Sequence, residues 1–345
     1  MDQALFLEEL NLRLAWDCHP SEYLDRYLVS GVQDPRINGQ SILTRAWLID
    51  TLHPGRFDAL IDEELRFGAV LTWIVQELEK GSKRCELLDA MESTCRTRAP
   101  DFVLAAYSWL QEETCSIPDY ITGALGECCC DLPRRWLSDP VLDVFMTIWN
   151  EQLSRLPISS LSVLEAACGS ANDYRFLHRC GIARFLHYTG IDIAPKNIAN
   201  ARSRHPDTNF LVQSILATDL PDHSYDCLYC HDLLEHLSPD ALEHALAEMS
   251  RLARTDILLH FFNGKPSGNH EIVLLEPYHR NRLSMEKIAS FFERLGATAT
   301  VLEMDRWFRE KIGSPGYHNP NAFSLIVEKS PVLPSERQAV ECGDA

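Results

Sequence analysis

The chain has 345 residues, of which 46% are hydrophobic, and a formal net charge of −18. This length suits two folded domains with buried cores. No apolar run approaches the roughly 20 residues of a membrane helix, and the acidic, amphipathic N-terminus differs from a leader peptide, so we expect a cytoplasmic protein without membrane insertion. Because duplex nucleic acid is bound by clustered Lys and Arg, the acidic balance disfavours such a partner.

Residues 1–155 carry apolar side chains at three- and four-residue spacing nearly throughout, interrupted by Pro and Gly. This pattern predicts an all-helical N-terminal domain of roughly six to eight helices. The role of this domain is left open by the sequence: it could form a lid over a site, an acceptor-binding surface or a homodimer face. Trp149, on the last of these helices, could lie over a bound cofactor.

After Pro157 short β-rich runs alternate with helical segments, which predicts an α/β domain at 156–330 with a mostly parallel sheet, followed by a flexible tail at 331–345. The seven predicted strands are 162–167, 187–192, 209–214, 225–231, 255–262, 299–305 and 322–329, and the predicted helices include Pro195–Arg204, Pro239–Leu252 and Ser284–Leu295. The last two strands are joined only by an irregular loop, 307–320, so they should pair as an antiparallel hairpin.

The twelve cysteines do not predict disulfides, because a chain of this size without an export signal keeps its thiols free. Cys128–Cys130 are adjacent and cannot all point at one metal ion. Cys227–His231 matches the string of covalent haem attachment but lies in a predicted buried strand, which favours core thiols. His260, His279 and His318 lack metal-ligand spacing, so no metal site is expected.

The segment Val163–Asp173 reads as a buried strand that ends in a turn of small residues and opens a helix. Ligands of open α/β sheets bind outside the carboxyl ends of the strands, and small side chains let a ligand approach the backbone N–H groups. The second strand ends at Asp192, 23 residues beyond Gly169. A carboxylate there can accept hydrogen bonds from both hydroxyls of a ribose, although it could also cap the following helix.

These residues resemble the first motif of the class I S-adenosylmethionine-dependent methyltransferases, acid-x-Gly-x-Gly-x-Gly, which stands here as Glu165, Ala167, Gly169 and Ala171. The stretch 220–237 and the closing hairpin also fit this family. The resemblance covers about half of the chain and implies a Rossmann-like doubly wound fold. It further implies S-adenosylmethionine as the cofactor and a small-molecule acceptor, natural products included.

The resemblance also implies roles for single residues. Asp192 would take the ribose, Ile193 would lie against the adenine, and Ser214 and Ile215 would face its amine. The implied cofactor-binding residues are therefore Glu165, Ala167, Gly169, Ala171, Asp192, Ile193, Ser214, Ile215 and His231.

For the acceptor side, the resemblance places His236 near the methyl-transfer face. If the acceptor is a hydroxyl, His236 or His279 is the candidate base, whereas an amine or an activated carbon makes a smaller demand. The candidate acceptor-binding residues are Glu276, Tyr278, Arg282 and Trp307.

Two other functions compete with methyl transfer. Alanine replaces the family's glycine at Ala167 and Ala171, and Ser214 stands where many members have an acid, which favours a non-catalytic S-adenosylmethionine-binding or scaffold protein. A nicotinamide-dependent oxidoreductase is disfavoured by the absence of a G-x-G-x-x-G motif.

Overall fold

A computed structural model of the chain describes residues 38–62, 64–65, 139–275, 278–313 and 320–329. In the N-terminal part it shows helix α3 (Gly39–Leu52), helical residues at 58–62 and 64–65, and helix α8 (Asp139–Ser154). The predictions for the other N-terminal helices and for the tail fall outside the described residues.

A seven-stranded sheet forms the centre of the α/β domain, in the order β10-β11-β5-β4-β1-β2-β3. Strands β1 to β5 run parallel, and β11 is antiparallel to both of its neighbours. The strands are β1 (Leu161–Ala166), β2 (Leu186–Asp192), β3 (Asn209–Val212), β4 (Tyr225–His231), β5 (Ala253–Phe261), β10 (Thr298–Glu303) and β11 (Phe323–Glu328). All seven predicted strands are confirmed, as is the antiparallel pairing of the last two.

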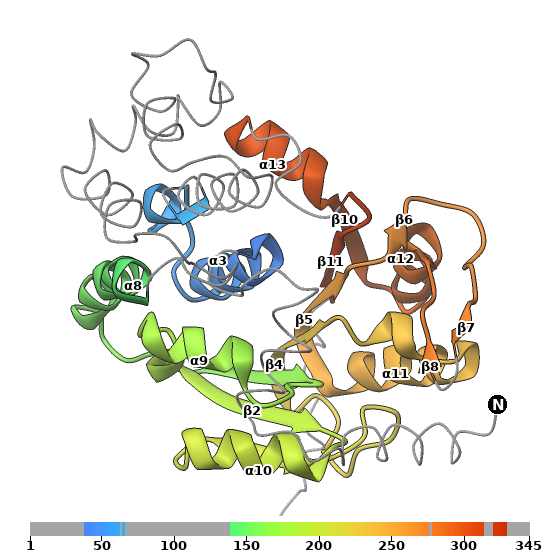
Figure 1. Cartoon of the computed structure of the whole chain (residues 1–345), viewed down its shortest axis with the longest axis horizontal. Helices are drawn as coiled ribbons and strands as arrows, with labels where there is room; N and C mark the ends of the chain where they lie inside the picture. The colour runs from blue at the N-terminus through green and yellow to red at the C-terminus, as the bar shows by residue number, and fades with distance from the viewer. Residues whose placement is uncertain (1–37, 63, 66–138, 276–277, 314–319, 330–345) are drawn as a thin grey trace, which may run out of the picture.

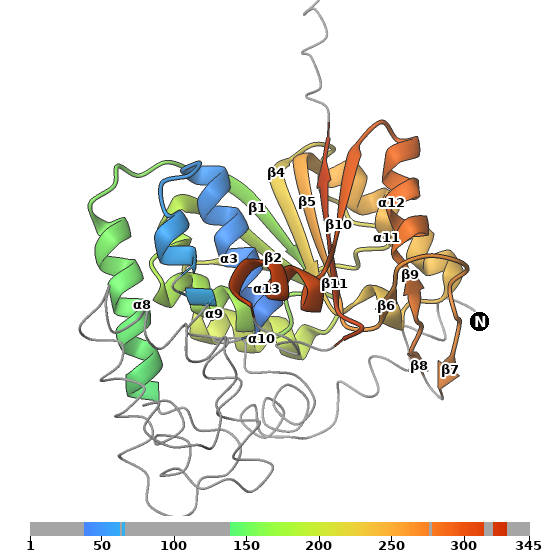
Figure 2. The ribbon, with the colours of Figure 1, turned by 90° about the horizontal axis from the view of Figure 1, so that it is seen from above.

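Helices cover both faces of the sheet (Figures 1 and 2). One hydrophobic core joins the sheet to α3, α8, α9 and α10, and a second core joins it to α11 and α12. These helices are α9 (Asn172–Arg179), α10 (Pro195–Arg204), α11 (Pro239–Leu252) and α12 (Met285–Arg294), with short 3-10 turns η2 (Ala183–Phe185) and η3 (Leu234–His236). The doubly wound, Rossmann-like architecture is therefore confirmed.

The segment between β5 and α12 carries two small two-stranded ladders. In one, β6 (Gly264–Lys265) pairs with β9 (Leu283–Ser284), and in the other β7 (Leu274–Leu275) pairs with β8 (Tyr278–His279). The apolar side chains of residues 272–275 are exposed on the second ladder.

The prediction of an irregular loop after β10 was wrong, because helix α13 (Met304–Ile312) begins directly after that strand. Met304, Phe308 and Ile312 are buried at four-residue spacing, which is a helical stripe. Gly313 ends the helix with a φ of +72°, a conformation that glycine adopts without strain.

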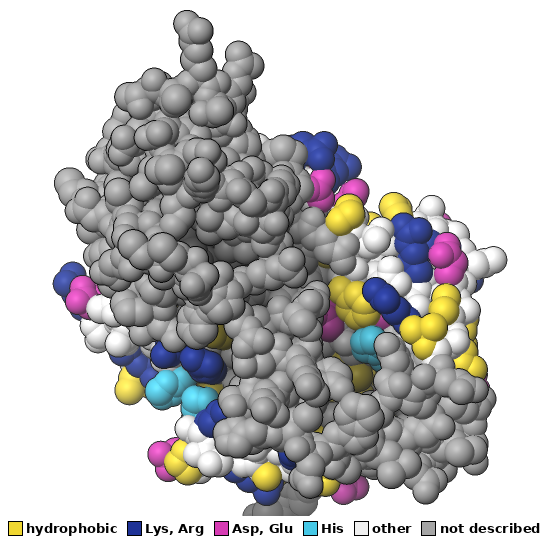
Figure 3. Space-filling model, viewed as in Figure 1, with side chains coloured by type: hydrophobic (Ala, Val, Ile, Leu, Met, Phe, Trp, Pro, Cys, Tyr) yellow, Lys and Arg dark blue, Asp and Glu magenta, His cyan; other side chains and the backbone are white. Residues whose placement is uncertain are grey.

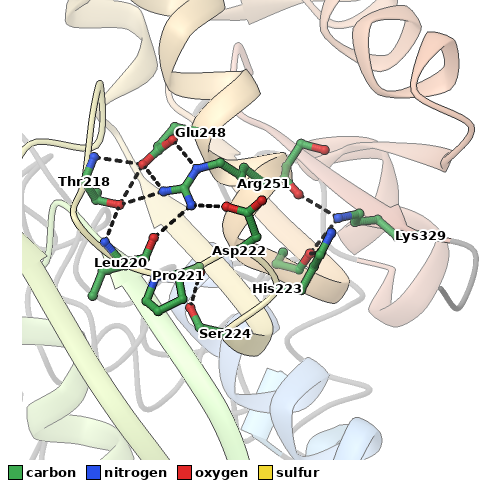
Figure 4. A network of polar contacts seen from close by, with 11 residues as sticks. Thr218, Leu220, Pro221, Asp222, His223, Ser224, Glu248, Arg251 and Lys329 are labelled. Atoms are coloured by element: carbon green, nitrogen blue, oxygen red, sulfur yellow. Dashed lines mark hydrogen bonds and ion pairs between the residues drawn. The ribbon is translucent and has the colours of Figure 1, made fainter. Parts of the chain in front are cut away.

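A polar network ties the loop between β3 and β4 to α11 (Figure 4). Glu248 accepts hydrogen bonds from the Thr218 hydroxyl at 2.6 Å and from the Arg251 guanidinium at 2.6 Å. Arg251 also donates to the Leu220 carbonyl at 2.8 Å. Hydrogen bonding by Arg251 is the main reason that the pKa of Glu248 falls to about 2. The network holds this loop in addition to the core packing of Ile215 and Leu216.

Charge is unevenly distributed over the surface. Residues 174–206 contain six Lys and Arg and one acid, Asp192, which is buried. Figure 3 shows basic and histidine side chains next to each other over α9 and α10.

Among the described helices, none is long and apolar enough to cross a bilayer.

Candidate functional site

The turn after β1 alternates into the left-handed region at three positions. Ala167, Gly169 and Ala171 have φ angles of +59°, +54° and +65°. The two alanines thus keep the backbone conformation that glycine adopts freely, at a cost of about 1–2 kcal/mol each. A Cβ built on Gly169 would meet only Asn172 Nδ2, at 4.0 Å. The turn is therefore open at Gly169, with space beside its backbone.

Asp192, at the tip of β2, is bonded directly to this turn. Its Oδ2 accepts a hydrogen bond from the Gly169 N–H at 2.9 Å. Its Oδ1 accepts from the Ala194 N–H at 2.8 Å and from Asn197 Nδ2 at 3.2 Å. Burial raises the pKa of Asp192 in spite of these donors. A carboxylate oxygen has two lone pairs, so Oδ2 retains capacity for a ligand hydroxyl.

The other residues expected near an adenine differ in their surroundings. Ile193 is half-buried, and the Ser214 hydroxyl accepts from the Leu216 N–H at 3.3 Å. Ile215 is 7% exposed and packs in the core with Leu164. The side chain of Ile215 is thus part of the sheet's packing, because the chain turns back immediately after β3.

Glu165 lies inside the domain, four residues before Gly169. Its Oε2 accepts hydrogen bonds from the hydroxyls of Tyr188 on β2 and Tyr229 on β4, the latter at 2.6 Å. Burial, and then the nearby charge of Asp173, raise the pKa of Glu165 to about 8. A neutral carboxyl therefore lies beneath the turn at neutral pH.

Helix α3 lies across the carboxyl ends of the strands, between α8 and α13 in both ribbon views (Figures 1 and 2). Gln40 Nε2 donates to the backbone carbonyls of Phe261, at 3.1 Å, and Phe323, at 2.8 Å. The Ser41 hydroxyl donates to Asp173 Oδ1 at 2.9 Å, at the start of α9. A helix from the N-terminal part thus reaches both the start of α9 and the ends of β5 and β11.

Thr44 on α3 connects two histidines at the ends of neighbouring strands. Its hydroxyl lies 2.9 Å from His231 Nε2 and 2.8 Å from His260 Nε2. Asp173 Oδ2 is 3.8 Å from His231 Nδ1, and the Ser324 hydroxyl is 2.7 Å from His260 Nδ1. His231, expected at the cofactor, is therefore linked to α3 and to the helix that follows the turn.

The two candidate bases lie side by side. His236 Nδ1 hydrogen-bonds the backbone carbonyl of His279 at 2.9 Å. Asn281, which is fully buried, donates from its backbone N–H to the Glu235 carbonyl at 2.9 Å and from Nδ2 to the Leu237 carbonyl at 2.7 Å. The segment after β4 is thus fastened to the segment that follows β8.

The environments of these two histidines favour their neutral forms. Burial lowers the pKa of both His236 and His279. His279 is buried, and its Nδ1 has no hydrogen-bond partner among the described residues.

The expected acceptor residues are only partly described. Glu276 and the side chain of Tyr278 fall outside the described residues. Arg282 donates to the Gly264 carbonyl at 3.2 Å and to Asn321 Oδ1 at 3.1 Å, so its guanidinium holds two loops together. Trp307 is half-buried on α13, and not in a loop, where it lines a cavity of about 490 Å³ with Pro266 and Phe323. Arg282 is thus bonded to the loops at Gly264 and Asn321.

The remaining expectations concern the core. Trp149 is 1% exposed and packs against Phe57, with ring centroids 5.9 Å apart. Cys227 and Cys230 are buried free thiols, as expected for a core strand. Within the described part of the chain, no group of three or more His, Cys, Asp or Glu side chains is arranged to hold a metal ion.

Several residues at this site had no signal in the sequence. Gln40, Ser41 and Thr44 contact partners 132 to 283 residues away. Tyr188 and Tyr229 lie in strand patterns that indicate only burial. Strand β1 pairs with its neighbours so that Glu165 lies beside Gly190 on β2 and beside Tyr229 on β4. Knowledge of this register would have predicted the contact between Glu165 and Tyr229.

The parallel sheet, the open turn after its first strand and the acid at the tip of the second define a Rossmann-like nucleotide-binding domain. The family model described as a methyltransferase domain matches residues 163–256. The sequence of this segment therefore matches the family that its motifs resemble. Trans-aconitate 2-methyltransferase of Escherichia coli is 36% identical over 94 residues, which are 27% of this chain and 36% of the relative. The chain thus spans about a third of the length of the curated relatives it matches.

Two solved structures resemble the chain more distantly. The 1,6-didemethyltoxoflavin N1-methyltransferase of Burkholderia thailandensis is 14% identical, with a TM-score of 0.39 over 69% of this chain and 93% of that one. The magnesium protoporphyrin IX methyltransferase of Synechocystis PCC 6803 is also 14% identical, with a TM-score of 0.37 over 68% and 100%. At these TM-scores neither likeness says anything about the chemistry of this chain.

Proposed function

We propose that the protein is an S-adenosylmethionine-dependent methyltransferase that acts on a small-molecule acceptor. The observation that carries this proposal is the contact between the open left-handed turn at Ala167–Ala171 and the buried carboxylate of Asp192. Together they present backbone and carboxylate groups where a nucleoside would lie at the carboxyl edge of the sheet. The family match of residues 163–256 supports the same cofactor.

The residues present fit this cofactor. Asp192 Oδ2 has acceptor capacity for a ribose hydroxyl, and the space beside Gly169 admits a ligand close to the backbone. A side chain at position 169 would fill that space. When bound, S-adenosylmethionine supplies a methyl group on a positively charged sulfur.

The chain would contribute chiefly by positioning the acceptor in line with the methyl group and by excluding water, which is worth up to ~7–11 kcal/mol in well-oriented reactions. Helix α3 supports this role, because its contacts with Asp173, His231 and His260 cover the carboxyl ends of β4 and β5. We therefore propose that α3 covers the site, which agrees with a lid role for the N-terminal part.

A hydroxyl acceptor would need a base, and we assign His236 to that role. If Nδ1 donates to the His279 carbonyl, Nε2 is the basic nitrogen, and the lowered pKa keeps the ring neutral and able to accept a proton near pH 7. His279 is the second choice, because it is the more deeply buried of the two.

Calorimetry with S-adenosylmethionine and its demethylated product tests the cofactor. We expect the wild-type protein to bind both, and Asp192→Asn to bind about 10- to 100-fold more weakly, since a hydrogen bond to a charged group is worth about 1.5–3 kcal/mol. Asp207→Asn, an exposed aspartate nearby in sequence, is the matched control and should bind as the wild type does. Equal affinity of Asp192→Asn and the wild type would contradict the proposed site.

A second assay separates catalysis from binding alone. The strained alanines in the turn favour a non-catalytic binder as the alternative function. Release of S-adenosylhomocysteine in the presence of carboxylate, hydroxyl and amine acceptors, with trans-aconitate among them, would support the enzyme. Saturable cofactor binding without turnover on any acceptor class would favour the alternative.

A further inference from the structure

We infer that cofactor binding expels a proton from Glu165, and that Tyr188 and Tyr229 are the positioning residues that hold this carboxyl in place. The inference rests on the proposed function, because it requires a positively charged cofactor at the turn. It adds a coupling between cofactor affinity and pH to that function, and it assigns a role to two tyrosines in the sheet.

Both tyrosine hydroxyls donate to the same carboxylate oxygen, Oε2 of Glu165, from opposite sides of β1. Their strands are paired with β1 in a register that places Glu165 beside Gly190 on β2 and beside Tyr229 on β4. Tyr229 is fully buried, and Tyr188 is nearly so. The carboxyl is thus clamped in a single position within the core.

Gly190 makes the contact from Tyr188 possible. A Cβ at this position would lie 2.9 Å from the Tyr188 hydroxyl, 2.8 Å from the Phe210 ring and 2.9 Å from Cys168 Sγ. Contacts this short are essentially never observed for real Cβ atoms. The absence of a side chain at Gly190 therefore provides the space through which Tyr188 reaches Glu165.

The charged groups around Glu165 are mostly acidic. Asp173, at the start of α9, and Asp192, at the tip of β2, both disfavour its ionisation. The Cys168 thiol also lies nearby and is neutral, because burial raises its pKa. On β4, His231 Nδ1 lies 3.8 Å from Asp173 Oδ2, and from α3 the Ser41 hydroxyl also bonds Asp173. Among the described residues, no Lys, Arg or His forms an ion pair with Glu165.

This arrangement lacks a positive charge that the cofactor would bring. S-adenosylmethionine carries a sulfonium and an ammonium group, and a cation near a buried carboxyl favours its charged form. On binding, the carboxyl of Glu165 would lose its proton to solvent and become a carboxylate held by two hydroxyl donors. No other bond forms or breaks.

The test is calorimetry of S-adenosylmethionine binding to the full-length protein at pH 7 in buffers of different ionisation enthalpy. Because the pKa of Glu165 is raised to about 8, the free protein is largely protonated at this pH, and we expect release of about 0.9 proton per site. Affinity should rise by up to about eightfold between pH 6.5 and 7.5 and level off above pH 8, since ionisation then costs nothing.

Two variants test whether Glu165 is the source of the released proton and whether the tyrosines position its carboxyl. Glu165→Gln keeps an acceptor for both tyrosines but cannot ionise, so its binding should release no proton and lose the pH dependence. Tyr229→Phe removes one donor to the carboxylate, which should shift the pH at which affinity levels off upward. Tyr225→Phe, on the same strand, is the matched control and should behave as the wild type does.

The outcomes separate this inference from the proposed function. If the wild-type protein does not bind S-adenosylmethionine, the proposed function and the inference both fall. Binding without proton release at pH 7 overturns the inference alone. Proton release that persists in Glu165→Gln places its source at another group, and an unchanged pH profile in Tyr229→Phe removes the positioning role of the tyrosines.

Discussion

The two alanines of the turn after β1 adopt a left-handed backbone conformation that glycine normally favours. Ala167 and Ala171 stand where the family has glycine, and both keep a positive φ. The Gly169 N–H bonded to Asp192 explains why the turn does not relax, because a relaxed turn would leave this buried carboxylate with one donor fewer. The strain is local and is balanced by contacts across β1 and β2.

Relief of this strain is measurable. Ala167→Gly should raise the free energy of unfolding by about 0.5–1 kcal/mol, because the cost of a left-handed alanine exceeds the extra chain entropy of glycine. Ala166→Gly, one residue earlier in the strand, is the control and should lower stability by about 1 kcal/mol, since no positive φ is relieved there. Urea denaturation followed by fluorescence measures both. A loss of stability in Ala167→Gly would show that the turn is not strained.

Among the elements, α3 has the contacts that most affect the site. It bonds the ends of β5 and β11 through Gln40 and two histidines through Thr44. A buried ion pair at 2.5 Å joins Arg45 on α3 to Glu64, which lies in the helical residues that follow α3 in the chain. Polar groups that satisfy one another in this way fix the helix in one orientation, because an unpaired buried donor or acceptor is costly.

Two threonines on α3 allow a matched test of this docking. Thr44→Val should lower the free energy of unfolding by about 1–3 kcal/mol, because both His231 and His260 lose a hydrogen-bond partner. Both hydroxyls also donate to the carbonyl four residues earlier, Thr44 to Gln40 at 3.1 Å and Thr51 to Trp47 at 2.8 Å. Thr51 is exposed, so Thr51→Val should change stability by less than about 0.5 kcal/mol. Denaturant unfolding of the two variants under one set of conditions gives the comparison. Equal losses would mean that the histidine contacts do not hold the helix.

At the scale of the whole molecule, the described thiols report on the integrity of the core. Cys168, Cys180, Cys227 and Cys230 are all buried and free, and they belong to the two cores that cover opposite faces of the sheet. Burial raises the pKa of Cys180 and of Cys227 to about 12. A thiol reacts with alkylating reagents as the thiolate, so these four should be inert while the domain is folded.

Alkylation with iodoacetamide at pH 8, followed by peptide mass spectrometry, tests this expectation. In the native protein these four cysteines should stay unlabelled for hours, and in guanidinium chloride they should all react within minutes. The denatured sample is the control for reagent access. Rapid labelling of Cys230 in the native protein would show that β4 is not part of a closed core.

Local pattern was enough to predict the elements of the α/β domain and the place of its turn. Strand β4 and helices α10 and α11 have the predicted bounds, because burial of short apolar runs and proline at a helix start are local signals. Helix α13 was missed because the predicted strand 299–305 was extended over its first two residues and the segment 307–320 was interpreted as an irregular loop.

The sequence by itself determined the succession of strands and helices along the chain, the small-residue turn and the acid at the end of the next strand. Each of these is a pattern within a few residues. Only the tertiary structure decided that Asp192 bonds the turn, that two tyrosines clamp Glu165, and that α3 covers the strand ends. The physical reason is that these contacts join residues 23 to 283 positions apart. Such contacts depend on strand register and helix docking, which local periodicity does not encode.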